Sequence, residues 1–111
     1  MKQPRITDDG TTVTIDLHGV WVDRAIEDIR RLVSVAAERG RPSLRIIHGS
    51  STSDVHGTNR TIKHELHRAL DSASFPEVAS DFRDADTTVL ALDADTQADR
   101  NTITLFDLRR E

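Results

Sequence analysis

The sequence predicts an α/β domain, a small two-layer sandwich with two helices on one face of a mixed sheet of four or five strands. Two observations support this prediction, and a third excludes some kinds of site. Short apolar runs alternate with two stretches of helical apolar spacing, in the order β-α-β-α-β-β. The length of 111 residues suits one domain and is too short for two. The absence of cysteine excludes disulfide bonds and thiolate metal sites.

We expect residues 1–11 to form a flexible amino-terminal tail and residues 12–111 to form the single domain. The first segment is polar, contains Pro4 and Gly10, and shows no apolar periodicity. The sequence has no apolar run of about 18 residues and no signal-type amino terminus, so we expect a cytoplasmic protein without membrane contact. The sequence predicts no particular oligomeric state.

The first predicted strand spans residues 13–18, where apolar and polar residues alternate. The apolar side chains take one face, so Thr14, Asp16 and His18 share the other. A carboxylate two residues from an imidazole on one face can orient the ring and stabilise its charged form, a relation that acid-base catalysis uses. Gly19 follows and allows a sharp turn.

A long amphipathic helix is predicted from about Val22 to Arg39, because apolar residues recur there at helical spacing. Gly40 is placed to end this helix. Trp21, the only tryptophan, comes directly before it. We expect the Trp21 ring to pack in the core at the helix start, with stacking on a base as the alternative.

A second apolar run, residues 44–48, predicts a short buried strand that ends in His-Gly. The helix between the two strands makes a right-handed crossover, which leaves the strands parallel. Their carboxyl ends then lie at one edge of the sheet, where open sheets of this kind usually bind ligands. We therefore expect His18 and His48 to share a site at that edge.

A polar loop with glycine at both ends follows from residue 49 to 58, either as a phosphate cradle or as an ordinary connection. After it, apolar residues from Ile62 to Ala73 predict a second helix, capped by Thr58 or Asn59. Three further strands are predicted at residues 78–83, 87–92 and 102–108.

The net charge of -4 is spread unevenly along the chain. Residues 24–68 hold nine basic and five acidic side chains, whereas residues 71–99 hold eight acidic side chains and one basic. A nucleic-acid partner is therefore not excluded, because binding responds to local patches more than to totals.

Two histidines, His64 and His67, lie one turn apart on the second predicted helix and could both reach one metal ion. The alternative is that they are solvated or contact phosphate, because that helix face is rich in arginine and lysine. We favour the alternative, and so expect no metal and no cofactor.

Two motifs of this chain resemble those of the small MutS-related (Smr) domain family: Asp16-Leu17-His18-Gly19 at the end of the first strand, and Ile46-Ile47-His48-Gly49 at the end of the second. The resemblance spans roughly residues 12–108 and includes two further segments, Phe75-Pro76-Glu77-Val78 after the second helix and Thr102-Ile103-Thr104-Leu105 in the last predicted strand. It implies an α/β fold similar to the carboxyl-terminal domain of translation initiation factor three.

Several Smr domains nick DNA or cleave RNA, so the resemblance implies nucleic acid, either DNA or RNA, as the partner. Carried over residue by residue, it implies Asp16 and His18 as an acid-base pair, with His48 beside them. The residues expected to bind nucleic acid are Gly19, Gly49, Ser50, Ser51, Arg60, Lys63 and His64.

Two departures from the family pattern keep a second function open. Ser50 and Ser51 stand where the family often has Lys-Gly, which removes a phosphate-binding charge and backbone freedom. An acidic segment, residues 93–101, replaces a glycine-rich stretch. The alternatives are a nucleic-acid-binding domain that acts as a nicking endonuclease or endoribonuclease, and a catalytically inactive Smr-like binding or protein-interaction module.

Overall fold

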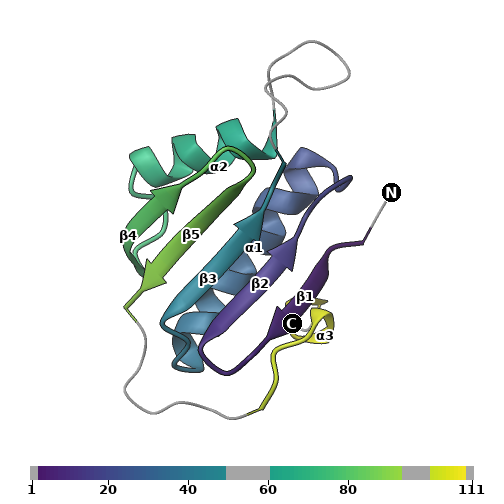
Figure 1. Ribbon diagram of the computed structural model, residues 1–111, viewed down its shortest axis with the longest axis vertical. Coiled ribbons are helices and arrows are strands. Elements are labelled where there is room, and N and C mark those ends of the chain that lie inside the picture. The colour runs from purple at the N-terminus through teal and green to yellow at the C-terminus, as the bar shows by residue number, and fades with distance from the viewer. Residues whose placement is uncertain (1–2, 50–60, 94–100, 110–111) are drawn as a thin grey trace.

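The structure, a computed structural model, describes residues 3–49, 61–93 and 101–109. These residues form a five-stranded mixed sheet with its helices on one face (Figure 1). No helix among them is long and apolar enough to cross a membrane. The elements are β1 (Arg5–Asp8), β2 (Thr12–Asp16), α1 (Val22–Glu38), β3 (Ser43–Ile47), α2 (Ile62–Asp71), β4 (Val78–Arg83), β5 (Thr87–Leu92) and α3 (Leu105–Arg109).

The strands lie in the order β1-β2-β3-β5-β4 across the sheet. Strands β2 and β3 are parallel, with Asp16 beside Ile47, and the other neighbours are antiparallel. The parallel pairing confirms the prediction from crossover handedness. As a result, the carboxyl ends of β2 and β3 and the amino ends of α1 and α2 lie at the same end of the molecule (Figure 1).

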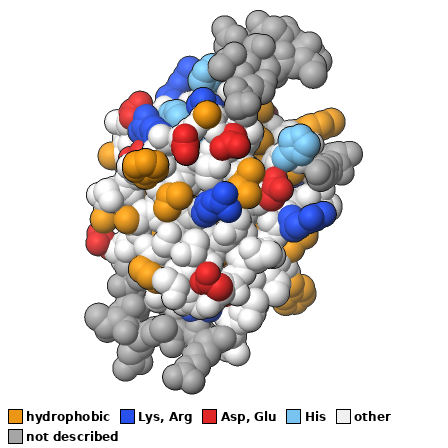
Figure 2. Space-filling view, viewed as in Figure 1, with side chains coloured by type: hydrophobic (Ala, Val, Ile, Leu, Met, Phe, Trp, Pro, Cys, Tyr) orange, Lys and Arg blue, Asp and Glu red, His pale blue; other side chains and the backbone are white. Residues whose placement is uncertain are grey.

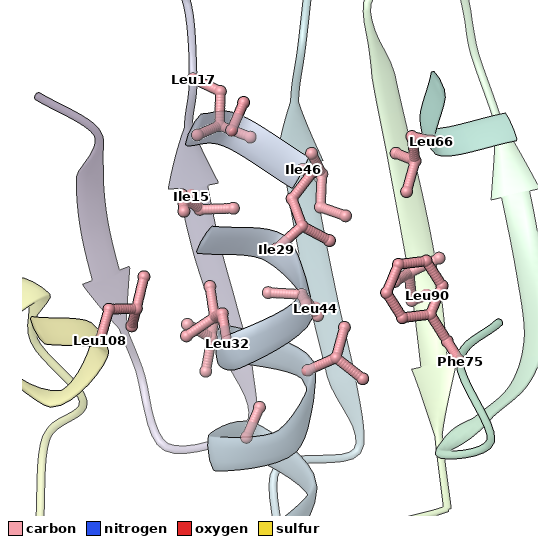
Figure 3. Close-up of a cluster of buried hydrophobic side chains, with 14 of the residues drawn as sticks. Ile15, Leu17, Ile29, Leu32, Leu44, Ile46, Leu66, Phe75, Leu90 and Leu108 are labelled. Atoms are coloured by element: carbon pink, nitrogen blue, oxygen red, sulfur yellow. The ribbon is translucent and has the colours of Figure 1, made fainter. Parts of the chain in front are cut away.

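The core lies between the sheet and the helices (Figure 3). Alternating apolar residues of β2, β3 and β5 meet the apolar stripes of α1 and α2, as the spacing of these residues predicts. The fully buried side chains include Ile15, Leu44, Leu90, Leu32 and Leu66. The opposite face of the sheet, which carries Thr14, Asp16 and Arg45, is the uncovered face of the described structure.

The two ends of the chain differ from the prediction. Strand β1 forms inside the segment expected to be a tail and pairs with β2. The strand predicted at residues 102–108 is wrong, because α3 forms there instead. The backbone N–H of Thr104 donates to Oδ2 of Asp107 at 2.8 Å. This is the bond that a capping box makes at a helix start, and it favours the helix over an extended strand.

Two details at helix starts also differ. Helix α2 is capped by Thr61, whose hydroxyl accepts the His64 N–H at 3.1 Å. Thr58 and Asn59, the expected caps, lie outside the described residues. The expectation that Trp21 packs in the core is wrong, since its side chain is 71% exposed. Its place as the residue before α1 leaves the ring outside the apolar stripe of that helix.

Candidate nucleic-acid interface

Several element ends converge where β2 and β3 end (Figure 1). The turn between β4 and β5 reaches this edge too, because the N–H groups of His48 and Gly49 donate to the Asp86 carbonyl at 3.1 and 3.0 Å. The amino ends of α1 and α2 also lie at this end of the molecule (Figure 1), and helix amino ends carry unpaired N–H groups and a positive dipole end. An anion is therefore favoured at this edge. We call it the strand-end edge.

Asp16 fixes the turn after β2. Its Oδ1 accepts a hydrogen bond from the backbone N–H of His18 at 3.0 Å. The Val20 N–H donates to the Leu17 carbonyl at 2.9 Å, and Gly19 takes a positive φ of 82°. The Asp16 carboxylate thus contacts the backbone of His18, whereas the sequence predicts a contact with its ring, and His18 is exposed.

His48 is placed on the other side of the sheet from Asp16. The Leu17 N–H donates to the Ile47 carbonyl at 2.9 Å, so the parallel pairing continues past the end of β2. Asp16 pairs with Ile47, and both point to the uncovered face, whereas Leu17 and His48 point to the helices and are buried. The structure therefore does not bring the Asp16 carboxylate and the His48 ring together.

The His48 ring is instead joined to His67 through Thr88. Nδ1 of His48 lies 2.7 Å from the Gly49 carbonyl oxygen, and its Nε2 lies 2.9 Å from Oγ1 of Thr88. Nε2 of His67 lies 3.3 Å from the same hydroxyl. The two rings meet edge to face with centroids 5.9 Å apart. We did not identify Thr88 from the sequence, because no local pattern links a residue of β5 to α2.

Burial lowers the pKa of both imidazoles below the ordinary histidine value. Nearby positive charge adds to this effect, from Lys63 on His48 and from Arg83, His48 and Lys63 on His67. Contacts with Gly49 and Asp86 raise the pKa of His48, and Asp71 raises that of His67, without reversing the shift. Both rings are therefore favoured in the neutral form.

The structure describes only some of the other residues predicted to bind nucleic acid. Lys63 and His64 lie in the first turn of α2, Lys63 partly and His64 largely exposed. Gly49 has a φ of 88° and open space around the position of a Cβ atom. Histidines visible on the uncovered side gather toward the strand-end edge, with both basic and acidic side chains among them (Figure 2). Ser50, Ser51 and Arg60 lie outside the described residues.

The metal interpretation of His64 and His67 gains no support from their surroundings. The described part of the chain contains no group of three His, Asp or Glu side chains that could hold a metal ion. The ring of His67 takes part in the contact with Thr88 described above.

A comparison with protein-family models matches residues 15–88 to the Smr domain. The match covers about two thirds of the chain, from β2 into β5, and includes both His-Gly motifs. No curated protein and no solved structure matches the chain.

Proposed function

This chain belongs to the Smr domain family, and we propose that it binds nucleic acid at the strand-end edge. The family is associated with nucleic-acid binding and nicking endonuclease activity. The single observation that supports this placement is that His18 is exposed, with its backbone N–H bonded to Asp16, at the edge where the amino ends of α1 and α2 lie (Figure 1). A phosphate group of the nucleic-acid backbone is the anion that these helix ends would favour.

We extend the proposal to cleavage of a phosphodiester bond with His18 as the acid-base group. An oxygen nucleophile, either water or a 2′-hydroxyl, attacks phosphorus, and the bond to the leaving oxygen breaks. An imidazole can take the proton of the nucleophile or supply one to the leaving oxygen, which is typically worth about 10²- to 10⁴-fold in rate. In this proposal Asp16 positions His18 through the turn rather than through the ring.

His48 acts in the proposal as a positioning residue. His48 is 7% exposed, and both ring nitrogens are within hydrogen-bond distance of Gly49 or Thr88. A substrate phosphate would have to displace one of these contacts to reach the ring. His48 therefore holds the end of β3 against β5 instead of donating or accepting a proton in the reaction.

The second candidate function is nucleic-acid binding without cleavage. It is favoured by the separation of Asp16 and His48 onto opposite faces of the sheet. Acid-base cleavage often uses two groups on one phosphate, one as base and one as acid, and these two do not form such an arrangement. A domain that binds through the same edge but leaves the backbone intact would have the same fold and the same exposed His18.

The experiment is a nicking assay on supercoiled DNA and a cleavage assay on RNA, each paired with a binding titration at several salt concentrations. We compare the wild type with His18→Ala and with Ser34→Ala, a control at an exposed residue of α1 that has no role in the proposal. Cleavage that disappears only in His18→Ala, with binding retained, supports the catalytic proposal. Salt-sensitive binding without wild-type cleavage supports the second candidate. Absence of binding at low salt rejects both functions.

A further inference from the structure

The contacts of His48 give its hydrogen bonds a fixed direction. Its Nδ1 lies 2.7 Å from the Gly49 carbonyl oxygen, which can only accept a hydrogen bond, so Nδ1 carries the proton. In a neutral ring the other nitrogen, Nε2, is then a bare acceptor. It lies 2.9 Å from Oγ1 of Thr88, and so it accepts the single hydrogen of that hydroxyl group.

The same reasoning fixes the tautomer of His67. The Thr88 hydroxyl donates its single hydrogen to His48. Toward Nε2 of His67, 3.3 Å away, the Thr88 oxygen can therefore act only as an acceptor. Nε2 of His67 therefore carries the proton, and Nδ1 is a bare acceptor in the neutral ring. Burial and neighbouring positive charges lower the pKa of both histidines, which favours these neutral forms near pH 7. No described residue is hydrogen-bonded to Nδ1 of His67.

Lys63 lies one turn before His67 on α2, and residues four apart on a helix are neighbours on one face, with Cβ atoms about 5–6 Å apart. Its charge acts on the pKa of both histidines, which also places the ammonium group close to them. The helix therefore presents a cation beside a hydrogen-bond acceptor. Both side chains are partly exposed.

The Lys63 ammonium group and Nδ1 of His67 attract different chemical groups of a nucleic acid. An ammonium group attracts a phosphate oxygen, whereas a bare imidazole nitrogen repels one and needs a hydrogen-bond donor. The donor nearest to a backbone phosphate is the ribose 2′-hydroxyl, which RNA has and DNA lacks. We propose that His67 is a specificity-determining residue that accepts a hydrogen bond from a ribose 2′-hydroxyl while Lys63 contacts the adjoining phosphate. The inference rests on the proposed function and names its preferred substrate as RNA.

Thr88 and His48 are positioning residues in this inference. Without the Thr88 hydroxyl, His67 is free to carry its proton on either nitrogen, and the tautomer with a protonated Nδ1 cannot accept the bond. Thr88 is fully buried, so its hydroxyl acts on binding through the two rings that it contacts, those of His48 and His67.

The test compares three single-stranded oligonucleotides of one sequence at one salt concentration: RNA, DNA and 2′-O-methyl RNA. The methyl form keeps the ribose oxygen but lacks the donor hydrogen. We expect the wild type to bind RNA about five- to tenfold more tightly than either of the others, which is the typical worth of one hydrogen bond. His67→Phe should bind all three oligonucleotides equally.

Two variants of Thr88 separate the hydroxyl from the packing. Thr88→Val removes the hydroxyl and should lose the RNA preference, whereas Thr88→Ser keeps the hydroxyl and should retain the preference. Nitrogen NMR of the His67 ring gives a second measurement, with an unprotonated Nδ1 expected in the wild type. If Thr88→Val does not fold, the variants His67→Phe and Thr88→Ser still test the inference.

The outcomes distinguish this inference from the function on which it rests. Equal binding of RNA and DNA by the wild type, an RNA preference that persists in His67→Phe, or a protonated Nδ1 of His67 overturns the inference and leaves nucleic-acid binding standing. Absence of binding to all three oligonucleotides at low salt overturns the proposed function and this inference with it.

Discussion

The carboxylate of Asp8 and the guanidinium of Arg41 form an ion pair in which each side chain is 1% exposed. Nε and Nη2 of Arg41 donate to the two carboxylate oxygens, each at 2.9 Å. The same carboxylate accepts the N–H groups of Gly10 and Ile103. Burial raises the pKa of Asp8, but the bonds from Arg41 and the backbone outweigh it and leave the pKa lowered. The pair joins β1, the end of α1 and the segment before α3.

Replacing Arg41 with methionine should strongly destabilise the domain, because the buried Asp8 carboxylate would lose its charged partner. We expect a loss of about 3–5 kcal/mol in the free energy of unfolding, measured by urea denaturation. Glu27→Gln is the control, since it breaks the exposed pair of Glu27 with Arg31 and should cost less than about 1 kcal/mol. A similar cost for the two variants would contradict the structural role of the Asp8–Arg41 pair.

Asp16→Asn and Asp16→Ala should differ in their effect on nucleic-acid cleavage or binding. Asparagine keeps an oxygen that can accept the His18 N–H, so the turn should persist and the activity should stay within a few-fold of wild type. Alanine removes the acceptor, which should cost about 0.5–1.5 kcal/mol of stability and most of the activity. The check is a parallel measurement of unfolding and activity. An asparagine variant as inactive as His18→Ala would instead assign a role to the negative charge.

Acidification should destabilise the domain through His48 and His67. Burial lowers the pKa of both rings in the folded state below the ordinary value of 6.5. Below that pH the unfolded chain binds more protons than the folded chain, so the stability present above about pH 6.5 is lost as the pH falls toward the folded-state values. Urea unfolding between about pH 7.5 and 5.5 measures this loss.

A variant with both histidines replaced by glutamine provides the comparison for that measurement. It should start from a lower stability at neutral pH, because Thr88 loses its partners, but its stability should change less over the same interval. If the wild type and the double variant lose equal stability on acidification, the loss comes from groups other than these two histidines.

The fold could be predicted where the decisive interactions are local. The alternation of β2 and the apolar stripe of α1 follow from residues within a few positions of each other, and the parallel pairing follows from the single crossover helix between β2 and β3. Residues 102–108 show the limit, because Ile103 and Leu105 also fit an alternating strand. The bond from Thr104 to the Asp107 carboxylate and the contact of that carboxylate with Arg39 favour a helix there.

The candidate site could be predicted less completely. Asp16, His18 and His48 are visible as motifs, and their expected roles stay predictions. Their mutual placement depends on the face to which each side chain points. The contact between His67 and Thr88 joins residues 21 positions apart, and the Asp8–Arg41 pair joins residues 33 apart. Neither distance corresponds to a helical or strand period, so periodicity gives no signal for them.

Trp21 and Phe82 provide a matched test of which surface binds nucleic acid. Both aromatic side chains are highly exposed, 71% for Trp21 and 70% for Phe82. Trp21 lies two residues after Gly19, at the strand-end edge, whereas Phe82 lies on β4 beside Val89, on the uncovered face of the sheet. Neither ring contributes to the buried core, so replacing either with alanine should change the free energy of unfolding by less than about 0.5 kcal/mol.

If nucleic acid binds at the strand-end edge, the Trp21 ring is placed to stack on an unpaired base. Trp21→Ala should then weaken binding to a single-stranded oligonucleotide by about 1–3 kcal/mol, with the same dependence on salt, because stacking involves no phosphate contact. Phe82→Ala should bind like the wild type. Titrations of the three proteins at two salt concentrations measure both quantities. Weaker binding by Phe82→Ala with unchanged binding by Trp21→Ala would move the interface to the uncovered face of the sheet.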